Sequence, residues 1–178
     1  MQQTNAIQRF TKLDISGRYV FNHEDLRKVF PEDNDRAFNA GLARLVAADV
    51  LYRPARGVYV YALSHRFNSS DTLQLIARTL RRGEYNYVSL ESALSDYGLI
   101  SQIPVDRLTV MTTGRKGEYK TKLGTIEFTH TKRSVTEILS SVVKTQGPLR
   151  FASKNAALRD QRRVGRNMHL VEEISDED

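Results

Sequence analysis

Apolar residues recur at helical spacing in two segments of the first 62 residues. The first segment predicts a helix over residues 1–14, because its apolar positions lie near helical spacing: Ile7, Phe10 and Leu13. The second predicts a longer helix that begins near Asn34, with one buried stripe at i, i+4, i+7 and i+8: Phe38, Leu42, Leu45 and Val46. A stripe of this width leaves the opposite side of the helix exposed to solvent.

Short extended segments lie before and after the longer helix. Tyr19-Val20-Phe21 predicts a short strand, and Asn22 predicts the N-cap of a short helix with acidic residues in its first turn. Residues 51–61 predict a β-hairpin in which Pro54 suits the turn and Gly57 adopts a positive φ. The resulting order of helix, strand, helix, helix and hairpin is that of a winged helix-turn-helix, which we assign to residues 1–62.

The exposed side of the longer helix carries residues suited to contacts with DNA bases. Arg36 and Asn39 can hydrogen-bond with the edges of guanine and adenine. Ala40 and Ala43 are small enough to let a helix lie close to the bases and contact thymine methyl groups, and Arg44 extends the same face. The sequence therefore predicts that this helix enters the major groove of double-stranded DNA.

Two arginines in the hairpin complete the predicted DNA-binding set. Arg53 and Arg56 lie near its turn, where they could reach the phosphate backbone. A surface helix and a solvated turn would carry the same residue types without binding anything. Residues 1–62 contain nine Lys and Arg against seven Asp and Glu. DNA binding would therefore depend on local patches and would weaken as salt rises.

A second, mixed α/β unit is predicted for residues 63–168, which makes the fold class α+β. Its elements are expected in the order helix, helix, strand, hairpin, helix and helix, over residues 70–80, 89–97, 108–110, 119–130, 134–146 and 153–163. Ser134 and Glu137 form a capping box for the fifth element, whose predicted apolar face is Val135, Ile138, Leu139, Val142 and Val143. Residues 169–178 are acidic and are predicted to form a disordered tail.

The composition places the chain among globular proteins. Its 178 residues are 40% hydrophobic and 27% charged, and no apolar run approaches the roughly 20 residues needed to span a bilayer. The N-terminus has no basic cluster followed by an apolar run, so no secretory signal is predicted. The absence of cysteine fits a reducing, cytoplasmic location, and the net charge of +6 favours a polyanionic partner.

No set of residues predicts catalysis or metal binding. The four histidines share no metal-ligand spacing: His23, His65, His130 and His169. Gly114-Arg115-Lys116-Gly117 lacks the spacing of a phosphate-binding loop and the Ser or Thr that follows it, and it predicts a tight turn. We therefore expect no enzymatic activity, no catalytic residue, no cofactor and no metal.

Basic residues gather around the strands of the second unit. The set comprises Arg115, Lys116, Lys120, Lys122, Lys132 and Arg133. The last predicted helix adds further arginines. Such charge is compatible with a solvated face, with a further contact to DNA, or with a surface for an acidic protein partner.

Three stretches of the chain together resemble the AbiEi-type antitoxins of abortive-infection, type IV toxin–antitoxin systems. They read RLVAADVLYRPARGVYVY, YVSLESALSDYGLISQIP and TKLGTIEFTHTKR. The resemblance covers roughly residues 5–160. Its more specific parts are Ser92-Ala93-Leu94 with Gly98-Leu99, and the later segment with Gly124, Ile126 and Phe128. After Asp160 the chain departs from longer relatives, because Gln161-Arg162-Arg163 stands where they continue with apolar residues.

The resemblance implies two activities. The winged helix would bind inverted repeats in the promoter of its own operon and repress it. The second domain would counter a nucleotidyltransferase-type toxin without a stable complex, and we assign the six basic residues from Arg115 to Arg133 to this surface. The alternative is a stand-alone winged-helix regulator whose second domain senses a ligand or binds another protein.

Overall fold

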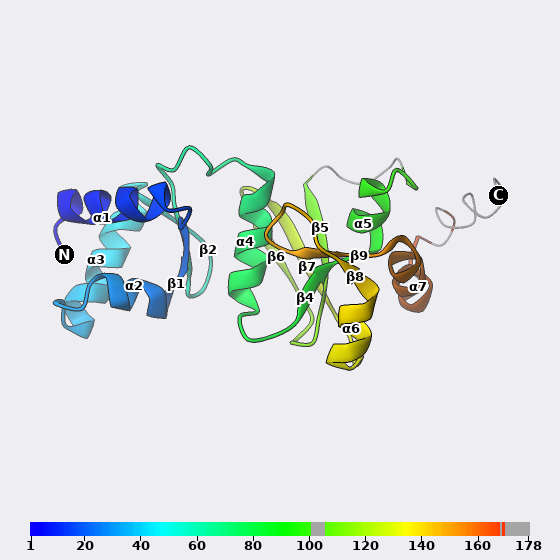
Figure 1. The fold of residues 1–178 in the computed structure, drawn as a ribbon. Coiled ribbons are helices and arrows are strands. Elements are labelled where there is room, and N and C mark those ends of the chain that lie inside the picture. Colours follow the sequence, from blue (N-terminus) through cyan, green and yellow to red (C-terminus); the bar gives the residue numbers. More distant parts are fainter. Residues whose placement is uncertain (101–105, 168, 170–178) are drawn as a thin grey trace. The chain divides into compact units, whose positions relative to one another are not determined.

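The computed structural model describes residues 1–100, 106–167 and 169 (Figure 1). In this part of the chain it is a mixed α/β protein with seven helices and two sheets. The chain divides into two units, residues 1–80 and residues 81–178. The predicted acidic tail, residues 169–178, lies outside the described residues apart from His169.

The first unit combines four helices with a three-stranded antiparallel sheet of order β1-β3-β2. Its elements are α1 (Gln3–Ile15), β1 (Val20–Asn22), α2 (His23–Val29), α3 (Asp35–Ala47), β2 (Leu51–Ala55), β3 (Val58–Tyr61) and α4 (Ser70–Leu80). The helices, strand and hairpin expected in residues 1–62 are all present, in the expected order.

Local capping fixes where two of these helices begin. The Asn22 side chain accepts a hydrogen bond from the backbone N–H of Asp25, and the Asp25 side chain accepts one from the backbone of Asn22. Asn34 accepts from the backbone N–H of Ala37 at the start of α3. The predicted N-cap at Asn22 and the predicted helix start near Asn34 are confirmed. Each asparagine satisfies a backbone donor that a helix leaves unpaired in its first turn.

An aromatic cluster forms the core of the first unit. The ring of Phe10 lies 5.6 Å from Phe21, 5.7 Å from Phe30 and 5.5 Å from Tyr61, measured between centroids. Phe38, Leu42 and Leu45 of the predicted α3 stripe are also buried. The stripe therefore turns one side of α3 inward and leaves its other side facing solvent.

The hairpin turn differs from its prediction by the position of Pro54. Gly57 has the expected positive φ of 78°, but Pro54 lies within β2, where the register shifts between Tyr52 and Ala55. β2 is an outer strand of its sheet. Such a strand tolerates proline at a bulge, because no neighbouring strand needs the missing N–H. The turn itself consists of Arg56 and Gly57.

Helix α4 belongs to the first unit, so the division falls after Leu80 instead of after residue 62. The buried residues Ile76 and Ala77 are part of this packing, and α4 contacts β1 and β3. The hydroxyl oxygens of Tyr19 and Thr72 lie 3.0 Å apart in a buried hydrogen bond. Sequence periodicity indicates that α4 is amphipathic, but it does not say which core its apolar side joins.

The second unit contains a six-stranded mixed sheet of order β6-β7-β5-β4-β9-β8. Its elements are β4 (Asn86–Val88), α5 (Leu90–Asp96), β5 (Arg107–Thr112), β6 (Gly117–Thr121), β7 (Gly124–His130), α6 (Val135–Ser141), β8 (Val142–Val143), β9 (Arg150–Ala152) and α7 (Lys154–Val164). The predicted hairpin around Gly124 is present, and Ile126 and Phe128 face the core.

The predicted apolar face of α6 is wrong in most of its members. The capping box of Ser134 and Glu137 is present and Ile138 is buried. However, Val135, Leu139 and Val143 are 41%, 45% and 42% exposed. The helix ends at Ser141, and Val142–Val143 form β8, which pairs with β9. A continuous helical spacing is therefore misleading here, because the chain leaves the helix halfway through the pattern.

None of the helices in residues 1–100, 106–167 and 169 is long and apolar enough to cross a bilayer.

Candidate nucleic-acid interface

All six side chains predicted to contact DNA are exposed. Four lie on the outer side of α3: Arg36, Asn39, Ala40 and Arg44. Two lie on the β2–β3 hairpin: Arg53 and Arg56. The exposure of the four α3 residues follows from the buried stripe of that helix, which assigns its remaining positions to solvent.

A groove of about 660 Å³ separates α3 from the hairpin. Its lining residues come from α2, α3 and the hairpin: His23, Asn39, Leu42, Ala43, Val46, Arg53, Arg56, Gly57 and Tyr59. The fold thus brings Asn39, Arg53 and Arg56 together, whereas Arg36, Ala40 and Arg44 lie elsewhere on α3. The lining combines cationic and amide side chains with an apolar floor.

Arg53 is held at this groove by an aromatic ring. Its guanidinium carbon lies 5.7 Å from the centroid of the Tyr59 ring, and Tyr59 is buried in β3. An arginine over a ring face gains a modest attraction and loses some side-chain freedom. The charge of Arg53 is consequently presented at the groove, next to the turn that carries Arg56.

His23 is a residue of this groove that sequence reasoning missed. Its Nε2 lies 2.9 Å from Oδ1 of Asn39, and its ring packs edge-on against Phe38 with a centroid distance of 5.1 Å. Its backbone N–H donates to the carbonyl of Gly57 at 3.0 Å. His23 therefore joins α2, α3 and the hairpin. Nothing in the sequence indicated these contacts, since the partners of His23 are 15 to 34 residues away.

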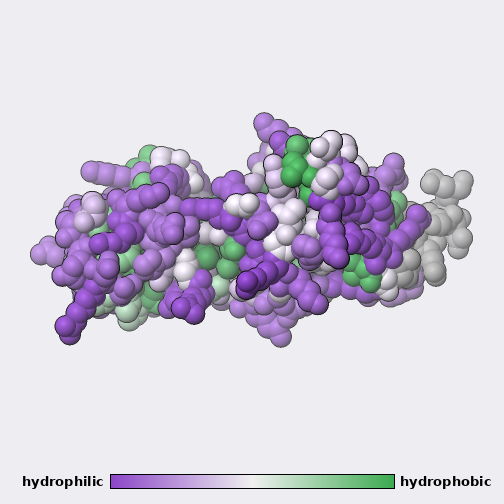
Figure 2. All heavy atoms as spheres, turned by 90° about the horizontal axis from the view of Figure 1, so that it is seen from below, coloured by the Kyte–Doolittle hydropathy of each residue, from purple (hydrophilic) through white to green (hydrophobic). Residues whose placement is uncertain are grey.

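On the face of the molecule drawn in Figure 2, hydrophilic residues predominate and hydrophobic ones form separate patches. Five of the six basic residues assigned to the second unit's surface are exposed: Arg115, Lys116, Lys120, Lys122 and Lys132. Lys120 lies in β6, and its Nζ is 3.9 Å from a carboxylate oxygen of Glu118. These five residues form what we call the β6 cationic surface.

Arg133 differs from those five because it is partly buried and paired internally. Its Nη1 donates to Oδ1 of Asp160 at 2.6 Å, and the Asp160 side chain is fully buried. Asp160 also accepts from Ser89 Oγ at 2.8 Å and from the Tyr87 hydroxyl at 3.2 Å. Burial, and then the nearby Asp160 charge, raise the pKa of Tyr87 to about 12. Arg133 thus neutralises a buried carboxylate.

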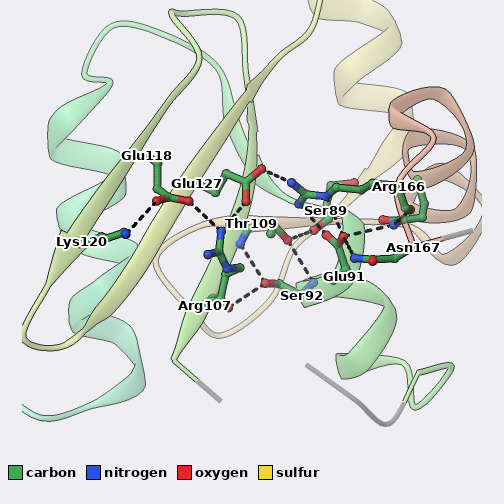
Figure 3. A network of polar contacts seen from close by, with 11 residues as sticks. Ser89, Glu91, Ser92, Arg107, Thr109, Glu118, Lys120, Glu127, Arg166 and Asn167 are labelled. Atoms are coloured by element: carbon green, nitrogen blue, oxygen red, sulfur yellow. Dashed lines mark hydrogen bonds and ion pairs between the residues drawn. The ribbon is translucent and has the colours of Figure 1, made fainter. Parts of the chain in front are cut away.

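A second polar network crosses the sheet of the same unit (Figure 3). Arg107 donates to Glu118 at 3.0 Å and to Glu127 at 2.6 Å. Arg166 donates to Glu127 and binds Glu91 through two hydrogen bonds of 2.8 Å and 2.9 Å. Alternating charges therefore connect β5, β6, β7, α5 and the segment after α7.

Glu91 is the most buried carboxylate in this network. Burial is the largest single influence on this carboxyl group and opposes its ionisation. Hydrogen bonds from Arg166, from the backbone and from Gln161, together with the Arg166 charge, outweigh burial and hold the pKa of Glu91 below its ordinary value. The two-pronged contact with Arg166 fixes the end of α7 against α5. This network has a structural role, since its arginines are already bonded to carboxylates.

The described residues include no group of three or more His, Asp or Glu side chains placed to hold a metal ion. No model of a known protein family matches the chain, and a search of curated proteins found no match.

Proposed function

We propose that the first unit is a winged helix-turn-helix that binds double-stranded promoter DNA, and that the chain is an AbiEi-type antitoxin. In this proposal it represses its own operon and counters a nucleotidyltransferase-type toxin through the second unit. The observation that carries the DNA-binding part is the convergence of Asn39, Arg53 and Arg56 on one groove between α3 and the hairpin.

The element order also supports a winged helix. It runs α1, β1, α2, α3, β2, β3, with β3 between the other two strands. In this interpretation α3 enters the major groove and the hairpin lies along the backbone. Arg53 and Arg56 then contact phosphates, while Asn39 and Arg36 face base edges. The small side chains of Ala40 and Ala43 let α3 approach closely.

The antitoxin activity is assigned to the β6 cationic surface, without Arg133. The five exposed cations there can be replaced at little cost in stability, because exposed side chains contribute little to it. Their positive charge suits an acidic surface or a polyanion. The assignment of this surface to a toxin rests on the family resemblance alone.

DNA binding is tested with the purified chain and a fluorescent fragment of its own promoter, titrated at several salt concentrations. The control is a fragment of the same length and base composition in scrambled order. The proposal expects tighter binding to the promoter and a linear fall of log affinity with log salt. Equal, weak binding to both fragments at every salt concentration would contradict promoter recognition.

Antitoxin activity is tested by expressing the chain together with the neighbouring gene and measuring growth. A triple variant, Lys116→Glu, Lys120→Glu and Lys122→Glu, should lose growth rescue while retaining its unfolding midpoint and promoter binding. The matched control reverses three exposed cations of α7, namely Lys154, Arg162 and Arg163. If the chain binds the promoter but the neighbouring gene does not inhibit growth, the alternative function of a stand-alone transcription regulator is favoured.

A further inference from the structure

We infer that His23 sets the base preference of Asn39 by holding its amide oxygen, so that Asn39 presents hydrogen-bond donors to DNA. This inference rests on the proposed DNA binding by the α3 groove. It changes the expectation from sequence that Asn39 reads an adenine edge. His23 acts here as a positioning residue.

The ring of His23 is oriented by contacts from three elements. The residue begins α2, directly after the Asn22 capping box. Its backbone N–H is bonded to the carbonyl of Gly57 in the hairpin turn, and its ring packs against Phe38 of α3 with an interplanar angle of 76°. These contacts leave Nε2 directed at Asn39, 2.9 Å from Oδ1.

The chemistry of this hydrogen bond assigns the proton. The amide oxygen of Asn39 can only accept, so Nε2 of His23 carries the hydrogen and donates it. The amide plane of Asn39 is thereby fixed with Oδ1 toward His23. Oδ1 has a second lone pair, but it is turned toward His23, so in this inference the Nδ2 group, with its two N–H donors, is the part presented to a ligand in the groove.

Adenine and guanine make different demands on this side chain. Two-point recognition of adenine needs both amide atoms: Oδ1 accepts from the N6 amino group and Nδ2 donates to N7. Guanine presents two acceptors, N7 and O6, and thymine presents O4. An asparagine whose oxygen is held by His23 therefore favours guanine or thymine over adenine. Removing the donor at position 23 lets the Asn39 amide rotate, so that Oδ1 and Nδ2 can both face adenine.

The test selects DNA from a pool of random sequences with the full chain and reads the base preference at every position. The variants are His23→Phe, which keeps an aromatic ring and lacks the donor, His23→Leu, which lacks both, and His23→Gln, which keeps a donor. Asn39→Ala identifies the position that Asn39 reads, because preference is lost there. The unfolding midpoint of each variant is measured in parallel.

At the position identified by Asn39→Ala, the wild-type chain should prefer guanine or thymine, and His23→Gln should keep that preference. His23→Phe or His23→Leu should shift it toward adenine by about fivefold or more, the discrimination of one good base contact. A merely structural role would weaken binding to all sequences and leave the preference unchanged. An adenine preference in the wild type, or an unchanged preference in both variants without the donor, overturns the inference. A wild-type chain that enriches no sequence overturns the proposed function and this inference with it.

Discussion

The α3 groove of the first unit and the polar network of the second both contain arginines, but they use them in opposite ways. Arg53 in the groove lies over the ring of Tyr59, whereas Arg107 and Arg166 are each bonded to two carboxylates. An arginine that neutralises internal carboxylates has little charge left for a ligand. The number of basic residues in a unit is therefore a poor guide to its binding surface. A better guide is whether each basic residue is already paired with a carboxylate within the chain.

The largest expected effect is on stability, from Arg133→Ala. The substitution removes the close cationic partner of the fully buried Asp160 carboxylate and leaves Arg159, whose Nε lies 3.8 Å from Oδ1. Because this longer ion pair remains, the expected cost lies at the lower end of the range for a broken buried pair, about 3 kcal/mol. Urea unfolding of the second unit measures this change. Lys132→Ala, which removes a neighbouring exposed cation, should change stability by less than about 0.5 kcal/mol. Equal effects of the two substitutions would end the distinction between Arg133 and the β6 cationic surface.

A somewhat smaller effect is expected for Glu91→Gln, and it should depend on pH. The pKa of Glu91 is lowered in the folded state, so its ionised form stabilises the fold above the unfolded-state pKa of about 4.3. That contribution is lost as the pH falls through the lower, folded-state value. The variant should be about 2 kcal/mol less stable than wild type at pH 7, from weakened hydrogen bonds with Arg166.

Urea unfolding at pH 7, 5 and 3 should therefore show the difference between wild type and Glu91→Gln shrinking as the pH falls. Glu118→Gln is the matched control, because Glu118 is more exposed and its ion pairs are of the weaker surface kind. A difference that grows toward pH 3 would be incompatible with a lowered pKa of Glu91.

The corresponding change in the groove, Arg53→Ala with Arg56→Ala, should affect DNA binding and spare stability. Loss of two phosphate contacts should weaken binding to all sequences by about tenfold and reduce the slope of log affinity against log salt by about 1.8. The control is Lys12→Ala with Arg18→Ala, two exposed cations of the same unit that do not line the groove. Identical salt slopes for the two double variants would show that Arg53 and Arg56 do not contact DNA phosphates.

The smallest effects are expected from the two capping boxes, one in each unit. Asn22→Ala and Ser134→Ala should each cost about 1 kcal/mol, because each removes a side-chain acceptor at a helix N-terminus. If the units unfold independently, Asn22→Ala lowers the transition temperature of the first unit only. Ser134→Ala then lowers that of the second unit only. Calorimetry of both variants measures this, and a shift of both transitions by either substitution would show that the units unfold together.

Local signals predicted much of the first unit. The caps at Asn22 and Asn34 involve partners three residues away, and the α3 stripe is set by helical spacing alone, so both are readable from sequence. The exposed side of α3 follows from that stripe. The contact between His23 and Asn39 does not, because it depends on how α2 packs against α3.

Non-local pairing explains what was missed in the second unit. β4 pairs with β5 on one side and with the distant β9 on the other, and neither β4 nor β9 was predicted. Leu139 fits a helical stripe, yet it is exposed, and the last two residues of that stripe form β8 after the helix ends at Ser141. Arg133 is indistinguishable from its exposed neighbours in sequence, since its partner Asp160 lies 27 residues further along the chain.

The position of Pro54 in β2 also limits how copies of the first unit can associate. The outer edge of a sheet exposes unpaired backbone groups that can template a strand from another molecule. β2 carries a residue without an N–H, a register shift and the positive charge of Arg53, and the adjoining turn adds the charge of Arg56. This edge resists growth of the sheet into an aggregate, even when many copies are crowded together.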